Sequence, residues 1–321
     1  MSFNYAAQLI IMLGFTIVAL SKLADDHKTI IQLLFYVSVV GGIIALLSLL
    51  GFFSDKILES EHRMSFTRIG VNAVAISISY SFIFSIMYLI FINRINIRTI
   101  IIFSLSFIML IFLIRTGTRS GIIGVFISVG LGYLLSYKFN LRHLLKFSFI
   151  FFLIIFSFNY IIDNIVSERI ATRILSINLE SINENSRIAI WNLATEWYSN
   201  NVLGTGAGNE AQVFNKFNVK EAHNVYISSM LQLGMIGLLI LVLAMAKIFL
   251  KLINIRNPNY KFLAMTTFLF LLIQTMKGSF IQTRLFWIPI ILVMTIAVID
   301  IKKYRANSQN ENNSLCRNTQ K

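Results

Sequence analysis

The chain has 321 residues, of which 56% are hydrophobic and only 13% are charged. A soluble domain has about 25% charged residues, so this composition excludes an ordinary soluble protein. Apolar runs of about 17 to 25 residues recur along the chain, and each is long enough to cross a bilayer as a helix. The sequence therefore predicts an all-α, polytopic helical membrane protein.

The net charge of +14 raises the question of a nucleic-acid partner. The basic residues are spread over the short segments between apolar runs, not gathered in one patch, which argues against nucleic-acid binding. The one cysteine, Cys316, lies in the polar C-terminal segment. The sequence therefore has neither a disulfide framework nor a thiolate metal site.

In chain order, the apolar runs predict nine transmembrane helices within a single domain, residues 1–300. These helices cover residues 4–21, 29–53, 71–92, 99–114, 120–137, 147–163, 223–246, 260–276 and 285–300. Residues 164–222 form one long polar loop. Residues 301–321 are Asn-rich and basic, and we expect them to form a disordered tail.

The distribution of Lys and Arg predicts the orientation of these helices. With the tail in the cytoplasm, the cytoplasmic segments hold sixteen Lys and Arg residues, and the short outer loops hold seven. This excess on the cytoplasmic side follows the positive-inside rule. It puts the 164–222 loop on the extracytoplasmic side.

Arg115 and Arg119 remain on the outer side, in a short segment between two predicted helices. If this turn is helical, the i, i+4 spacing places both guanidinium groups on one face. Arginine binds phosphate bidentately, so the pair suits a lipid-linked diphosphate. The alternative is that both residues are interfacial anchors that extend to lipid headgroups.

The long loop contains a predicted amphipathic helix that opens at Ser186 and continues past Trp197. Trp191 and Trp197 suit a helix that lies on the membrane surface. Arg187 adds another candidate phosphate ligand. The alternative is a purely structural lid helix.

Three glycines, Gly204, Gly206 and Gly208, follow this helix. Their backbone N–H groups could help to bind an anion. However, no strand precedes them and no βαβ unit surrounds them, as a nucleotide-type phosphate loop requires. A tight turn that returns the chain to the membrane is the better interpretation.

His223 and Asn224 stand where the loop meets the next predicted helix. A histidine imidazole can accept a proton near neutral pH, so this residue type suits a general base that acts on a sugar hydroxyl. A histidine here is also a common helix-end residue. No His/Cys cluster has metal-ligand spacing and no outer loop carries an Asp-x-Asp pair. We therefore expect a reaction without a metal or another cofactor.

The order of these features resembles the O-antigen ligase and Wzy-type polysaccharide polymerase superfamily. The resemblance rests on SRIAIWNLATEWYSNNVLGTGAGN, on HNVYISSMLQLGMIGLL, which follows after 13 residues, and on the upstream TRSGIIGVFISVGL. The last segment has the order Arg119-Ser120-Gly121 where the family has Ser-Arg-Gly. Each element is loose alone, but their order across one outer loop is fairly specific. The chain is shorter than most members, with fewer predicted helices.

The resemblance implies a glycosyltransferase at the outer face of the bacterial cytoplasmic membrane that acts, without a metal, on glycans linked to undecaprenyl diphosphate. It implies that Arg119, Arg187 and His223 lie near the diphosphate, and we expect them to be catalytic. We expect the remaining candidates to bind substrate; they are Arg115, Trp191, Gly204, Gly206, Gly208 and Asn224.

Within the superfamily we favour a polymerase that joins lipid-linked repeat units into O-antigen or capsular polysaccharide. Its expected partners are the lipid-linked glycan, membrane lipid, a chain-length regulator and a flippase. One alternative is a ligase that moves the finished glycan to a lipid A core. Another is a transporter or flippase, which would need charged residues buried at mid-span, and the predicted helices hold almost none.

Overall fold

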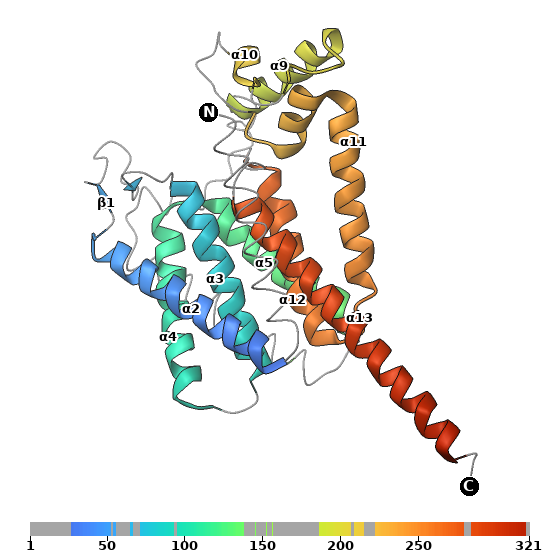
Figure 1. The fold of residues 1–321 in the computed structure, drawn as a ribbon. Helices are drawn as coiled ribbons and strands as arrows, with labels where there is room; N and C mark the ends of the chain where they lie inside the picture. Colours follow the sequence, from blue (N-terminus) through green and yellow to red (C-terminus); the bar gives the residue numbers. More distant parts are fainter. Residues whose placement is uncertain are drawn as a thin grey trace.

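The computed structural model describes residues 27–137, 186–214 and 222–318, apart from short gaps at 53, 56–64, 67–70, 93–94, 207–208 and 279–283, together with three isolated positions between 138 and 185. This part of the chain is almost entirely helical (Figure 1). The helices are α2 (His27–Leu49), α3 (Val71–Phe91), α4 (Ile97–Arg115), α5 (Arg119–Ser136), α9 (Ser186–Asn200), α10 (Ala211–Phe214), α11 (Val225–Ile253), α12 (Pro258–Thr275) and α13 (Arg284–Asn318). Between α2 and α3, the two-residue strands β1 (Ser54–Asp55) and β2 (Ser65–Phe66) pair antiparallel.

Several of these helices have the length and composition of membrane spans. Four are long and apolar enough to cross a membrane: Ile30–Leu49, Asn72–Phe91, Ile97–Arg115 and Val225–Ile253. Shorter apolar stretches lie in α5 and α13. These helices confirm the predicted helical, multi-pass membrane class. The predicted helices 4–21 and 147–163 fall outside the described residues, so the count of nine stays a prediction.

The helices of the bundle approach one another closely at glycines. A Cβ added to Gly42 of α2 would lie 2.7 Å from the Leu105 Cβ of α4. A Cβ added to Gly132 of α5 would lie 3.1 Å from the Thr266 Cα of α12. Small residues at helix crossings are typical of membrane proteins, in which close packing replaces the hydrophobic drive between helices.

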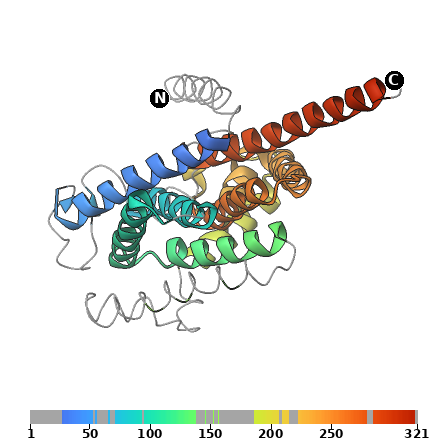
Figure 2. The ribbon, with the colours of Figure 1, turned by 90° about the horizontal axis from the view of Figure 1, so that it is seen from below.

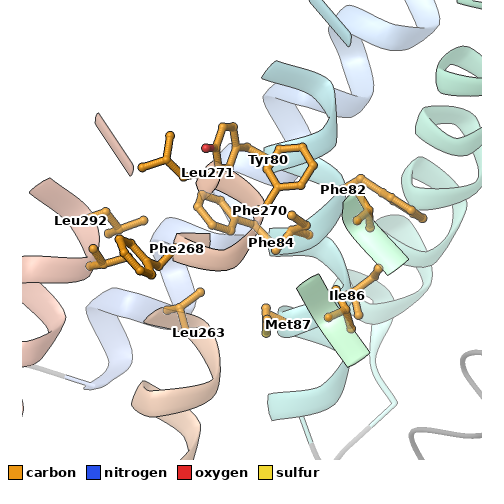
Figure 3. Packing of buried hydrophobic residues seen from close by; sticks show 14 of the residues in the cluster. Tyr80, Phe82, Phe84, Ile86, Met87, Leu263, Phe268, Phe270, Leu271 and Leu292 are labelled. Atoms are coloured by element: carbon orange, nitrogen blue, oxygen red, sulfur yellow. The ribbon is translucent and has the colours of Figure 1, made fainter. Parts of the chain in front are cut away.

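α3 and α12 contribute more buried side chains to the core of the bundle than any other two helices (Figure 3). Tyr80 of α3 and Phe270 of α12 meet edge to face, with ring centroids 4.8 Å apart. Such a pair contributes roughly 0.5–1.5 kcal/mol beyond its buried area. Of the apolar stretch in α3, 72% is buried, against 22% of that in α11. α3 is therefore central, whereas α11 has most of its surface free to face lipid.

α13 extends from Arg284 to Asn318 and projects beyond the bundle toward its C-terminal end (Figures 1 and 2). The sequence predicted a disordered tail over 301–321, whereas the structure describes residues 301–318 as part of this helix. No glycine or proline follows Pro289 within this helix. The helix that starts in the apolar segment can therefore propagate into the polar one, since extending an existing helix avoids the cost of nucleation.

Candidate functional site

One end of the bundle brings together helix ends that are far apart in the sequence. Gln274, near the C-terminal end of α12, donates from Nε2 to the carbonyl oxygen of Ser120 in the first turn of α5 at 2.9 Å. Thr275 donates from Oγ1 to the hydroxyl oxygen of Tyr226 in the first turn of α11 at 3.4 Å. α9 and α10 lie at the same end (Figure 1). This region, termed the loop end below, joins the start of α5 to the start of α11.

The α4–α5 turn carries two of the predicted phosphate ligands at the loop end. Arg115 is the last residue of α4 and Arg119 is the first residue of α5. Gly117 between them has a φ of +61°, so the turn is not helical. The helical turn on which the predicted i, i+4 alignment of the two guanidinium groups depended is therefore absent between these residues.

Arg115 and Thr118 of this turn differ in their burial. The Arg115 side chain is exposed, whereas that of Arg119 lies outside the described residues. The Thr118 hydroxyl, next to Arg119 in the chain, is buried and has no hydrogen-bond partner among the described residues. The turn thus holds one unpaired polar atom beside a predicted phosphate ligand.

The helix predicted in the long loop is present as α9. One face of α9 contributes to a small apolar cluster that is separate from the bundle core. The buried members of this cluster are Ile190, Ala194, Phe214, Ala222 and Leu231. Trp191 donates from its indole Nε1 to the carbonyl oxygen of Ala222 at 2.9 Å, so it ties α9 to the segment that precedes α11. Arg187, whose side chain lies outside the described residues, is about one helical turn earlier on α9.

The glycine segment packs against a break in α11. The break lies at Gly234, where φ is 70° and ψ is −168°. The N–H groups of Thr205 and Gly206 donate to the carbonyl oxygens of Leu231 and Gln232, at 2.7 and 3.0 Å. In an unbroken helix these two carbonyl groups would bond to later residues of the same helix. The turn therefore satisfies backbone acceptors that the break sets free.

These bonds favour the structural interpretation of the glycines. The Gly204 N–H donates to the Asn201 carbonyl oxygen at 3.0 Å, and the Asn209 N–H donates to the Gly206 carbonyl oxygen at 3.2 Å. The N–H groups at 204, 205, 206 and 209 are thus all used within the protein. In the described part of the segment, a tight turn accounts for the glycines. Gly208 lies outside the described residues.

His223 and Asn224 form the entry to α11. Asn224 is the N-cap: its side-chain oxygen accepts from the N–H groups of Tyr226 and Ile227, at 2.9 and 3.2 Å. His223 is exposed and has a φ of +52°. It is the only residue other than glycine with a positive φ in the part of the chain that the structure describes. Such a conformation costs on the order of 1–3 kcal/mol and persists only where neighbouring contacts impose it.

Sequence reasoning missed Glu210, an acidic residue directly after the glycine segment. Its side chain is only 5% exposed. It accepts hydrogen bonds from the Ala222 N–H at 2.5 Å, from the Ser228 hydroxyl, and from Gln232 Nε2 at 2.7 Å. The sequence offered a signal for this residue, because the chain has only 14 acidic residues and Glu210 lies between the two segments, 186–209 and 223–239, on which the resemblance rests. Glu210 joins the glycine segment, the His223 segment and the first turns of α11.

Among the described residues, no group of three or more His, Cys, Asp or Glu side chains is placed to hold a metal ion. A metal-independent reaction stays a prediction.

The geometry defines a helical, multi-pass membrane protein in which a loop helix, a glycine turn and a histidine-bearing helix entry meet at one end of the bundle. The family model described as O-antigen ligase matches residues 104–242. This stretch runs from α4 into α11 and contains every candidate residue named above. The match confirms the resemblance that the motifs predicted: over residues 104–242, which is less than half of the chain, the sequence is similar to the O-antigen ligase family. No curated protein matches the chain.

Proposed function

We propose that the protein is a polysaccharide polymerase that joins undecaprenyl-diphosphate-linked repeat units at the outer face of the cytoplasmic membrane. The family match supports glycosyl transfer of the ligase and polymerase type. The proposal rests on the arrangement of helix ends at the loop end. There, hydrogen bonds join the start of α5, which carries Arg119, to α12, and α12 to the start of α11, which follows His223.

In the proposed reaction, an acceptor sugar hydroxyl attacks the anomeric carbon of the lipid-linked donor glycan. The bond between the anomeric carbon and the phosphate oxygen breaks, and the lipid diphosphate leaves with the electron pair. The hydroxyl proton passes to the His223 imidazole, whose exposed position gives it access to the acceptor. One bond forms and one bond breaks at the anomeric carbon, so the reaction needs no oxidant or reductant.

Negative charge builds on the leaving diphosphate, and arginine is suited to stabilise it. Arg119 at the start of α5 and Arg187 on α9 are the proposed ligands. Preorganised donors of this kind are each worth on the order of 3–4 kcal/mol in the transition state. Arg115, which is exposed at the end of α4, is a further proposed contact to the lipid-linked substrate.

α9 and the glycine turn would cover the reacting atoms and limit access of water, which favours transfer over hydrolysis. The Trp191 bond to the Ala222 carbonyl oxygen supports this role, because it fixes the loop helix next to the His223 segment. The ligase alternative uses the same site chemistry and differs in the acceptor.

The glycans of a deletion strain test the proposal. Loss of a polymerase leaves downstream transfer intact, so we expect single repeat units on the final acceptor and no ladder of longer chains. Long chains that accumulate on undecaprenyl diphosphate, with none at the cell surface, would overturn the polymerase proposal in favour of a ligase. Single repeats trapped on lipid at the inner face would indicate a flippase instead.

A further inference from the structure

Glu210 is a buried carboxylate whose three hydrogen-bond partners are all donors. The Ala222 N–H bonds to Oε1, and the Ser228 hydroxyl and Gln232 Nε2 bond to Oε2. Gln232 also donates to Ser228 Oγ at 3.0 Å, so the two α11 residues are linked to each other. Burying a carboxylate is costly unless hydrogen bonds compensate. Three convergent donors provide that compensation, and two of them lie one turn apart on α11.

The hydrogen bond to the Ala222 N–H connects Glu210 to the proposed catalytic histidine. Ala222 precedes His223, and the Glu210 carboxylate fixes its N–H group. The Trp191 indole fixes its carbonyl oxygen, which belongs to the peptide group that continues to the His223 nitrogen. Both peptide groups that flank Ala222 are therefore held in place.

On the other side of His223, the Asn224 cap fixes the chain to the first turn of α11. His223 thus adopts its φ of +52° between two clamped segments. Because the backbone is fixed on both sides, the direction of the His223 Cα–Cβ bond is also fixed.

We infer that Glu210 is a positioning residue that holds His223 in the geometry needed to take the acceptor proton. The inference rests on the proposed function, because it assigns Glu210 a role through His223. The carboxylate itself need not touch the substrate. A general base displaced by about 1 Å can lose on the order of a hundredfold in rate, so the effect of Glu210 should appear in turnover.

The test compares Glu210→Gln with the exchange variant Glu210→Gln/Gln232→Glu. In the single variant, the new amide N–H₂ replaces the carboxylate oxygen that accepts from both Ser228 and Gln232, and it faces the N–H₂ of Gln232. In the exchange variant, the amide oxygen at 210 can still accept from Ala222, while the carboxylate at 232 accepts from the amide at 210 and from Ser228. Glu196→Gln on α9 is the matched control, since Glu196 is exposed.

Turnover is measured in vesicles loaded with undecaprenyl-diphosphate-linked repeat units. For Glu210→Gln we expect a roughly 10- to 100-fold lower maximal rate, with a half-saturating concentration of these repeats within about twofold of normal. The exchange variant should recover to within about threefold. Amide hydrogen exchange over residues 222–226 should be faster in the single variant and near normal in the exchange variant. Glu196→Gln should resemble the parent in both measurements.

His223→Ala in the same assay separates two kinds of failure. An inactive His223→Ala alongside a fully active Glu210→Gln would overturn the positioning role and leave the proposed function standing. A fully active His223→Ala would overturn the proposed mechanism itself, and the role of Glu210 with it. If Glu210→Gln does not accumulate in the membrane, the activity of the exchange variant is the test. An exchange variant that accumulates normally but is inactive would overturn the inference. An active exchange variant supports it.

Discussion

Gly204 and Gly234 lie against each other and join the loop to the break in α11. A Cβ added to Gly204 would come within 2.8 Å of the Gly234 nitrogen, and a Cβ added to Gly234 would come within 2.5 Å of the Val202 carbonyl oxygen. Both glycines have positive φ, at 79° and 70°. The loop and the helix can approach this closely only because neither position has a side chain.

Gly204→Ala should destabilise the protein much more than Gly206→Ala. Both glycines have positive φ, so both variants carry the backbone cost of roughly 1–2 kcal/mol. Among the described residues, a Cβ at Gly206 would meet only Asn209 Nδ2, at 3.5 Å, whereas one at Gly204 would collide with α11 backbone. We expect a further loss of about 1–3 kcal/mol for Gly204→Ala, measured by thermal unfolding of the purified variants in one detergent. Equal losses would show that the contact with α11 is not tight.

Two substitutions distinguish the capping role of Asn224 from its proposed role as a substrate ligand. Asn224→Ala removes the acceptor for the Tyr226 and Ile227 N–H groups, and we expect it to cost about 1 kcal/mol of stability. Asn224→Asp keeps that acceptor, so its unfolding temperature should stay near that of the parent. If Asn224 also contacts the diphosphate, the added negative charge should lower glycan output despite normal stability. Normal output from Asn224→Asp would restrict the residue to its capping role.

The sequence predicted the class of fold because membrane helices are encoded by long local runs of apolar residues. The runs at 71–92 and 99–114 correspond to α3 and α4 within two residues. The helix over residues 301–318 was not expected from the sequence. A polar composition indicates that a segment has no hydrophobic core, but it does not exclude a helix. Residues 301–318 need no buried face to continue a helix that already exists.

The candidate site was predictable in its parts and not in its contacts. Trp191, the glycines and His223 were identified from type and order, but their bonds connect positions such as 191 and 222, or 205 and 231. The pairing of Thr205 with Leu231 depends on the break at Gly234, and one glycine in an apolar run does not reveal a break. Glu210 was missed because its partners are distant in the sequence: Ala222 lies before α11, and Ser228 and Gln232 lie on α11.

The orientation of the loop is tested by a reporter fused at Asn200, the exposed last residue of α9. Because the Lys and Arg distribution predicts that residues 164–222 lie outside, a reporter that works only beyond the cytoplasm should be active there. The same reporter fused at Asn254, after α11, is the matched control and should be inactive. Activity of a cytoplasmic reporter at Asn200 would contradict the proposed function, since the substrate would lie on the other side.

Arg187→Lys tests whether the second residue of α9 binds phosphate as a planar fork. Lysine keeps the charge but cannot form the bidentate contact, so glycan output should fall about tenfold or more. The protein level in the membrane should stay normal, because α9 is fixed through Trp191 and the apolar cluster. Arg98→Lys is the matched control. The Arg98 guanidinium lies over the Phe35 ring, 5.7 Å from its centroid, an interaction that an ammonium can also make. Glycan output from Arg98→Lys should stay near normal. If the output from Arg187→Lys is also near normal, Arg187 has a structural role and does not belong to the proposed diphosphate site.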